Sequence, residues 1–296
     1  MRRRTAPCGS GNGLENNGGI MDMQQRKQMI QTAFDTVAEG YDHPSLPFFP
    51  QTAQRMWSHL SPEPNACCLD VATGTGVMAL EAARHLPAGS VIGVDLSEGM
   101  LRQARAKAQA QQLRNASFRQ MDVDDLVFAK DHFDIVTCNF GLFFMDDMEA
   151  VMRRLAHTVK PGGQIAISSF TETAFSPFAP AFLALYEDFG KQVPPLSWKR
   201  LANVGVIEEI YRAAGITDLV FHEEPLGYAL QSEQQWWDVV WNAGFRGLLN
   251  QLSESEREAF KAQHLDTVRT LCRKGKNWLD TGVIIAIGKK GSVSKS

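Results

Sequence analysis

A strand that runs through a glycine-rich turn into a helix constrains this chain more than any other feature of its sequence. Residues 69–76 read LDVATGTG, and an amphipathic stretch follows at 77–85. Gly74 and Gly76 allow a tight turn and leave no Cβ between backbone and ligand, while the first helical turn offers free N–H groups. We therefore expect a ligand to bind close to the main chain at this junction.

Short apolar runs rich in β-branched residues alternate with amphipathic stretches from residue 67 onward, a pattern typical of βα units and a parallel sheet. Strands are predicted at 67–71, 91–94, 116–121, 133–138, 164–169, 218–223 and 282–287. Helices are predicted at 24–38, 77–85, 99–112, 149–159 and 206–214, with Lys160, Pro161, Gly162 and Gly163 ending the fourth. The expected fold is α/β: a Rossmann-like seven-stranded, mostly parallel sheet with helices on both faces and a helical cap insertion.

The cap is predicted from the second half of the chain. Residues 231–272 have an almost wholly helical pattern just before the last strand, and an aromatic stretch at 175–189 precedes them. Two interpretations fit the aromatic residues here and after the fourth strand, since they could line an acceptor pocket or form plain core. The residues concerned are Phe140, Phe143, Phe144, Trp236, Trp237 and Trp241.

Charge and cysteine spacing exclude several classes of function. The net charge is −3 and Lys and Arg are scattered, so nucleic acid is not an expected partner. No apolar run approaches the roughly 20 residues of a membrane helix, and residues 1–20 lack the apolar segment of a signal peptide, so we expect a cytoplasmic protein without membrane insertion. Cys67 and Cys68 are adjacent and no histidine pair has ligand spacing, so no metal is expected. The oligomeric state is left open.

Acidic residues after the first two strands indicate which ligand the glycine turn binds. Gly74, Gly76 and Ala79 also satisfy the pattern of dinucleotide sites, which leaves an NAD-dependent oxidoreductase as an alternative. Asp70 would repel a pyrophosphate but suits the ammonium and sulfonium of S-adenosylmethionine. Asp95 follows the glycines by about twenty residues, where a carboxylate can accept ribose hydroxyls of either cofactor. No Tyr-x-x-x-Lys motif follows the fourth strand, which favours S-adenosylmethionine.

The third and fourth strands add further candidate contacts. Asp122 and Val123 could clasp the exocyclic amine and ring nitrogen of an adenine, although Asp122 with Asp124 and Asp125 also fits an acidic helix start. Asn139 ends the fourth strand, beside the expected position of the reacting methyl group.

Over roughly residues 31–170 these motifs resemble the class I S-adenosylmethionine-dependent methyltransferases of type 11/25, in particular the ubiquinone and menaquinone biosynthesis enzymes. The resemblance implies S-adenosylmethionine as the cofactor. It implies contacts to the methionine moiety from Asp70, Ala72, Gly74 and Gly76, to the ribose from Asp95 and Leu96, to the adenine from Asp122 and Val123, and near the sulfur from Asn139, with Met100 and the lid tyrosine Tyr41 completing the site. Quinone-pathway members carry an Arg-Asn pair where this chain has FGLFF at 140–144, and the smaller members have no counterpart of the long cap.

The sequence is expected to divide into four segments. Residues 1–20, rich in Gly and Asn, are expected to be a disordered tail, and Met21 or Met23 could equally be the natural first residue. Residues 21–65 would form N-terminal lid helices, and 66–170 the Rossmann-like core that binds S-adenosylmethionine. Residues 171–296 would supply the remaining strands and a helical cap that binds the acceptor.

The expected activity is transfer of a methyl group to a small, apolar or aromatic acceptor by in-line displacement, which requires alignment more than a catalytic side chain. His43, beside the lid tyrosine, and His222, on a late strand, are the only candidates for a base, and a structural or surface role is open for both. O-, C-, N- and S-methylation all stay open, and a non-catalytic cofactor-binding protein is a further alternative.

Overall fold

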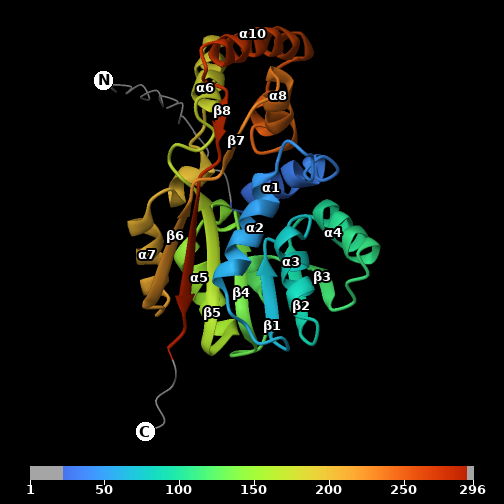
Figure 1. The fold of residues 1–296 in the computed structure, drawn as a ribbon, viewed down its shortest axis with the longest axis vertical. Helices are drawn as coiled ribbons and strands as arrows, with labels where there is room; N and C mark the ends of the chain where they lie inside the picture. Colours follow the sequence, from blue (N-terminus) through green and yellow to red (C-terminus); the bar gives the residue numbers. More distant parts are fainter. Residues whose placement is uncertain (1–22, 292–296) are drawn as a thin grey trace, which may run out of the picture.

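A seven-stranded sheet forms the centre of the computed structural model, which describes residues 23–291 (Figure 1). In spatial order its strands are β3 (Ala116–Gln120), β2 (Ser90–Asp95), β1 (Cys67–Val71), β4 (Phe133–Asn139), β5 (Val159–Phe170), β9 (Val283–Lys289) and β6 (Asp218–Glu224). The first five run parallel, and β9 is antiparallel to both of its neighbours. The predicted Rossmann-like, mostly parallel sheet is confirmed, whereas the tail predicted at 1–20 lies outside the described residues.

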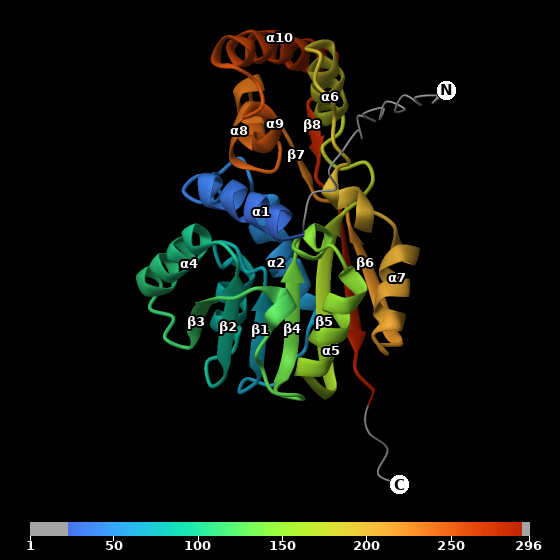
Figure 2. The ribbon, with the colours of Figure 1, turned by 180° about the vertical axis from the view of Figure 1, so that it is seen from behind.

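Helices cover both faces of the sheet, as predicted. In Figure 1, α2 (Phe48–His59) and α3 (Val77–His85) lie in front of it with α4 (Glu98–Ala110) beside them, whereas α5 (Met148–Thr158) and α7 (Val204–Ala213) cover the face seen in Figure 2. α3 begins and ends at its predicted residues, because Gly76, with φ of +80°, turns the chain into the helix. The Tyr211 hydroxyl anchors α7, lying 3.1 Å from the carbonyl oxygen of Ile165 and 2.9 Å from that of Ala286.

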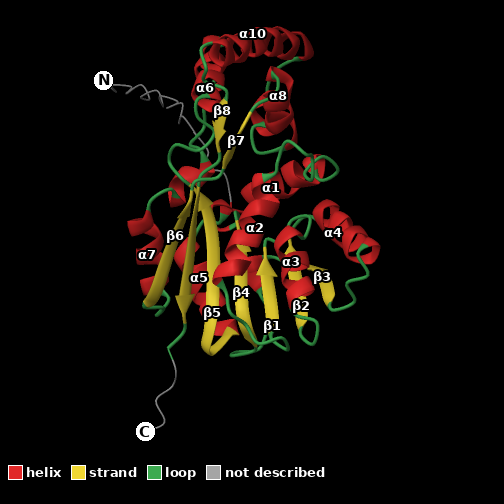
Figure 3. Ribbon diagram, in the orientation of Figure 1, coloured by secondary structure: helices red, strands yellow, loops and turns green. Residues whose placement is uncertain are grey.

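A cap stands on the carboxyl edge of the sheet (Figure 3). It consists of α6 (Phe178–Asp188), α8 (Glu233–Asn242), α9 (Arg246–Leu249) and α10 (Glu254–Arg273), joined to the sheet through the short paired strands β7 (Gly227–Ala229) and β8 (Trp278–Asp280). α10 packs against α6 and α8, with Phe182, Trp236 and Phe260 fully buried. Much of the predicted aromatic stripe is thus the core of the cap itself.

Two segments differ from the sequence prediction. The turn predicted at 160–163 is wrong, because these residues belong to β5, which begins at Val159. The ladder continues there since Gly162 N donates to Lys290 O at 2.8 Å and Lys160 pairs with Asp134 at 2.8 Å, while the register with β4 shifts. The helical pattern at 231–272 is in fact three helices, and Ser253 starts the last with a capping box.

A further helix, α1 (Met23–Val37), crosses the carboxyl edge of the sheet between α4 and the cap in both ribbon views (Figures 1 and 2). None of its residues is buried, so polar contacts hold it in place. Asp35 accepts hydrogen bonds from Ser97 Oγ at 2.5 Å and Gly99 N at 2.8 Å. Arg26 pairs with Asp146 beyond β4. A helix held by a few polar contacts, without a buried apolar face, can open and close at low cost.

Candidate active site

A cavity with about 1170 Å³ of empty space, counting its open mouth, lies at the carboxyl ends of β1, β2 and β4. Its walls are α1 and the loops that follow β1, β2, β3 and β4. From β1 the sheet extends through β2 and β3 on one side and through β4 and β5 on the other, so the cavity lies at the topological switch point where open α/β sheets bind ligands. All of its lining residues fall between Arg26 and Asp146.

The glycine turn presents bare backbone to this cavity. Ala72 and Gly74 have φ of +52° and +54°, and a Cβ built on Gly74 would meet nothing within 4 Å. Gly76 serves packing instead, because its Cβ would lie 2.9 Å from Ala104 Cβ and 3.1 Å from the Phe118 ring. Only Gly74 therefore leaves room for a ligand against the main chain, and Gly76 lets the turn pack against β3 and α4.

Asp70 is a buried acid that lines the cavity. Its side chain is fully buried and accepts hydrogen bonds from Thr73 Oγ1 at 2.6 Å and Thr137 Oγ1 at 2.7 Å. Burial outweighs these bonds and raises the pKa of Asp70 to about 6. The neighbouring charge of Asp95 raises this pKa further. The buried negative charge is thus left for a ligand to balance.

Asp95 adds a second acid to the same lining. One carboxylate oxygen accepts from Gly74 N and the other from Ser97 N, both at 2.8 Å, and burial again raises the pKa. Two neighbouring carboxylates that are shielded from water are costly to keep ionised, which favours a positively charged ligand. S-adenosylmethionine, with its ammonium and sulfonium, fits this lining, whereas the pyrophosphate of a dinucleotide would meet Asp70 with repulsion.

The acid after β3 is engaged by α1. Asp122 Oδ1 accepts from Asp124 N at 2.9 Å and starts the short 3-10 helix η1 (Val123–Asp125), while Oδ2 pairs with Lys27 at 2.7 Å. Lys27 also pairs with Asp124 at 2.5 Å. Asp122 therefore both starts a helix and lines the cavity, and Lys27 of α1 lines the cavity beside it.

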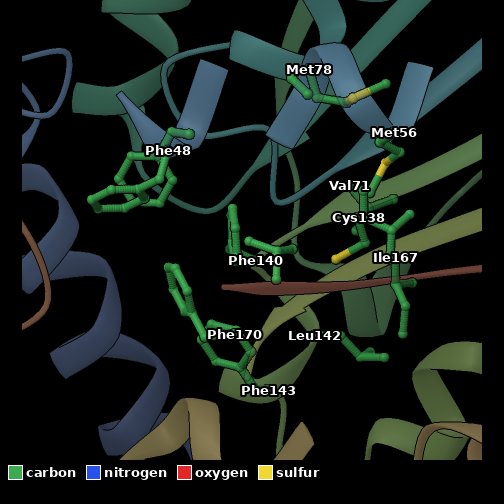
Figure 4. Packing of buried hydrophobic residues seen from close by; sticks show 14 of the residues in the cluster. Phe48, Met56, Val71, Met78, Cys138, Phe140, Leu142, Phe143, Ile167 and Phe170 are labelled. Atoms are coloured by element: carbon green, nitrogen blue, oxygen red, sulfur yellow. The ribbon is translucent and has the colours of Figure 1, made fainter. Parts of the chain in front are cut away.

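Aromatic rings also line the cavity. Tyr41 stacks on Phe49 with ring centroids 4.8 Å apart, and Phe34 meets Phe144 edge-on at 5.2 Å. Phe140, a lining residue, stacks on Phe170 with ring centroids 4.2 Å apart, and Figure 4 shows these two side chains next to each other. Burial and the charges of Asp95 and Asp42 raise the pKa of Tyr41, which stays protonated. One cavity thus combines acidic side chains with apolar, aromatic ones.

The structure brings together most residues predicted for the cofactor. Tyr41, Asp70, Ala72, Gly74, Asp95, Leu96, Met100, Asp122, Val123 and Asn139 line the cavity, and Gly76 alone of that set does not. Of the aromatic candidates, Phe140 and Phe144 line it, whereas Phe143, Trp236 and Trp237 are buried elsewhere and Trp241 lies under the Arg246 guanidinium.

The two histidine candidates lie away from the cavity. His43 Nδ1 accepts a hydrogen bond from Ser45 N at 3.2 Å. His222 lies on β6, and its ring stacks on that of His59 in α2, with ring centroids 3.6 Å apart. No histidine of residues 23–291 lines the cavity, and no group of three or more acids, histidines or cysteines in that range is arranged to hold a metal. Nor does that range contain a helix long and apolar enough to cross a membrane.

Some lining residues were not predicted from the sequence. Arg26, Lys27, Gln31 and Phe34 come from α1, whose helical pattern carries no motif. Thr137, which does not itself line the cavity but donates a hydrogen bond to Asp70, was also missed, although the two residues are partners in the parallel register of β1 and β4. A polar residue inside an otherwise apolar strand is the signal that could have identified it.

Comparison with known proteins agrees with this geometry. Residues 68–163 match a family model described as a methyltransferase domain. The nocamycin O-methyltransferase of Saccharothrix syringae is 28% identical over 248 residues, covering 78% of this chain and 88% of that protein. The aklanonic acid methyltransferase DauC of Streptomyces sp. (strain C5) is 30% identical over 213 residues, which cover 71% of this chain and 96% of that protein. The crystal structure of YcgJ from Bacillus subtilis shares the fold, with a TM-score of 0.56 at 20% identity, covering 82% of this chain and 99% of that one.

A Rossmann-like sheet with an acid-lined cavity at its switch point defines a class of α/β proteins that bind nucleoside-type cofactors. The relatives found by sequence comparison, which are named methyltransferases, define this class further. The chain belongs to the class I S-adenosylmethionine-dependent methyltransferases, and S-adenosylmethionine is its cofactor. The comparisons give no support to an NAD-dependent oxidoreductase.

Proposed function

We propose that this enzyme methylates a small, apolar, ring-bearing acceptor in the cavity between α1 and the carboxyl edge of the sheet. The observation that carries the proposal is the mixed lining, which contains the carboxylates of Asp70 and Asp95 as well as the rings of Phe49 and Phe140. A cationic cofactor and an apolar acceptor would meet there. The named activities of relatives toward nocamycin and aklanonic acid support a small-molecule acceptor.

The acidic residues of the lining would hold the cofactor. Asp70 balances positive charge, Asp95 with Leu96 binds the ribose, and Asp122 with Val123 binds the adenine, with Lys27 sharing Asp122. Ala72, Gly74, Met100 and Tyr41 complete the lining, and Gly76 shapes the turn. S-adenosylmethionine, when bound, supplies an electrophilic methyl group and a neutral thioether as leaving group.

The protein's own contribution would be alignment and exclusion of water. α1 covers the cavity through its Lys27 and Asp35 contacts, and the rings of Tyr41 and Phe49 restrict the position of a flat acceptor. Since no histidine of the described chain lines the cavity, His43 and His222 are poor candidates for a base. The acceptor would therefore be one that ionises readily in solution.

The cap would influence the acceptor indirectly. The ring of Phe245 in the cap packs against that of Phe175, with centroids 5.6 Å apart. Phe175 packs in turn against Phe170, with centroids 4.8 Å apart, and Phe170 stacks on the cavity residue Phe140. Packed rings of this kind transmit changes in shape. The predicted acceptor-binding role of the cap thus becomes a proposal that the cap sets the position of the aromatic wall.

Calorimetric titration tests the cofactor site. The purified protein should bind S-adenosylmethionine and S-adenosylhomocysteine with micromolar Kd and should not bind NAD. Asp95→Ala should lose this binding, because it removes the proposed ribose acceptor and frees Gly74 N. Asp266→Asn, at an exposed position of α10, is the matched control and should bind normally. Binding of NAD alone would overturn the proposal.

A further inference from the structure

Ser168 on β5 holds the side chain of Asn139 at the end of β4. The two residues are partners in the parallel register of these strands. Ser168 Oγ accepts a hydrogen bond from Phe140 N at 3.1 Å and donates to Asn139 Oδ1 at 2.5 Å. Ser168 is fully buried, whereas Asn139 lines the cavity.

This geometry determines which way the Asn139 amide faces. A distance of 2.5 Å lies within the range of O–H···O hydrogen bonds and below that of N–H···O bonds. The serine hydroxyl has a single hydrogen, and with the Phe140 N–H already directed at its oxygen that hydrogen is free to point at Asn139. The amide oxygen is therefore turned toward Ser168, and the NH2 group is left for the cavity.

The location of this NH2 group suggests its partner. Asn139 directly precedes Phe140 of the aromatic wall, and it ends the strand next to β1, which carries Asp70. The acids of the lining can only accept hydrogen bonds when ionised, so they would repel an anionic oxygen that approaches them. An uncharged donor at the border of the aromatic wall is suited to such an oxygen.

We propose that Asn139 Nδ2 donates a hydrogen bond to an ionisable oxygen on the acceptor ring, a phenol or enol, and that Ser168 is the positioning residue for this contact. The inference rests on the proposed function, because it assigns an acceptor contact within the same cavity. It defines the acceptor class more narrowly as ring-bearing molecules with a hydroxyl near the methylated atom. Asn139 would then contribute to acceptor choice more than to cofactor affinity.

Two shape-matched probes test the proposal on the full chain saturated with S-adenosylhomocysteine: 1-naphthol, and 1-methylnaphthalene, which replaces the hydroxyl by a methyl group. Asn139→Ala and the similarly sized Asn139→Leu should each weaken 1-naphthol binding by about tenfold, since a hydrogen bond to a polar oxygen is lost. Binding of 1-methylnaphthalene and of S-adenosylhomocysteine should change less than about twofold.

Ser168→Ala should reduce the preference for 1-naphthol over 1-methylnaphthalene, and it should have no additional effect in the Asn139→Ala background, because its role passes through Asn139. Ser169→Ala is the matched control: its neighbouring hydroxyl is fully buried but has no hydrogen-bond partner among the described residues, so both probes should bind as in the wild type.

The other outcomes separate this inference from the proposed function. Unchanged 1-naphthol binding in both Asn139 variants would overturn the inference and leave the proposed function intact. An equal loss of S-adenosylhomocysteine affinity would assign the amide to the cofactor and also overturn it. A wild-type protein that binds S-adenosylhomocysteine but neither probe would overturn the ring-bearing acceptor and this inference together.

Discussion

Thr137 on β4 donates a hydrogen bond to Asp70 on β1 at 2.7 Å, and both side chains are fully buried. The two residues are also partners in the parallel register of these strands. A residue of β4 therefore holds the carboxylate of β1 in a fixed orientation across the switch point. Because Asp70 cannot turn toward solvent, its ionisation depends on burial and on the charge of whatever occupies the cavity.

Binding of S-adenosylmethionine should weaken below about pH 6. Burial raises the pKa of Asp70 to about 6, so the ligand-free protein carries an ionised carboxylate above this pH and a protonated one below it. A cationic ligand prefers the ionised form, so its Kd should increase by up to about tenfold per pH unit below the pKa. Titration calorimetry between about pH 5 and pH 8 measures this. Asp70→Asn should bind weakly without the pH step, and a constant wild-type Kd would contradict the assignment.

Gly141→Ala should damage the cofactor turn. A Cβ at this position would lie 2.5 Å from Ala72 Cβ and 2.9 Å from Cys138 Sγ, so the loops after β1 and β4 would have to separate. We expect a loss of about 1–3 kcal/mol in the free energy of unfolding, together with weaker cofactor binding. Gly244→Ala in the cap is the control, because its Cβ would meet nothing within 4 Å. Equal denaturation midpoints of the two variants would refute the argument.

Much of the sheet and of the acidic lining could be predicted from the sequence, because both depend on local patterns. Buried parallel strands such as 67–71 read as apolar runs, and the motif residues Asp70 and Asp95 lie at strand ends that meet at one edge. The turn predicted at 160–163 is wrong for the opposite reason. Pro and Gly there signal a break locally, but pairing with the neighbouring strands keeps the segment in the sheet.

Contacts between distant segments could not be predicted in the same way. Lys27 reaches Asp122 across 95 residues, and Ser168 meets Asn139 through strand register alone. Trp236 illustrates the limit of a periodic pattern, since helical spacing predicts a buried face without showing what covers it. In the structure it packs inside the cap and does not line the cavity.

The cap should lose stability in acid because of His264. This side chain is fully buried and its Nε2 accepts the indole N–H of Trp236 at 2.7 Å, so it is held neutral. Burial lowers the pKa of His264 to about 4. Since the unfolded chain takes up the proton more readily, the stability is complete above about pH 6.5 and is lost as the pH falls toward 4, by about 3 kcal/mol.

Thermal unfolding as a function of pH measures the effect of His264. His264→Gln keeps an acceptor for Trp236 but does not titrate, so its Tm should decrease less than the wild-type Tm between about pH 7 and pH 4.5. His157→Gln, at an exposed position on α5, should follow the wild type. Parallel pH profiles for His264→Gln and the wild type would rule out this residue as the source.

Loss of the Lys27 ion pairs should loosen α1 without unfolding the protein. Lys27 contacts Asp122 and Asp124, and no residue of α1 is buried, so the global stability should change by less than about 1 kcal/mol. In Lys27→Gln, hydrogen exchange across residues 23–37 should be faster than in the wild type, and S-adenosylhomocysteine should restore part of the protection. The exposed pair of Arg212 with Glu208 offers a control in Arg212→Gln. Unchanged exchange in α1 would show that other contacts hold the helix.

Phe245→Leu should change how the enzyme binds a flat acceptor without changing cofactor affinity. Phe245 lies in the cap, and its ring centroid is 5.6 Å from that of Phe175 and 6.0 Å from that of Trp198. Phe175 in turn packs on Phe170, which contacts the lining residue Phe140. Leucine keeps an apolar side chain but removes the ring contacts, so the wall should relax by a small displacement. We expect the Kd of 1-naphthol to change severalfold and that of S-adenosylhomocysteine to stay constant. Trp278→Leu, at an exposed position in the cap, should alter neither, and a parallel loss of both affinities in Phe245→Leu would show general destabilisation instead.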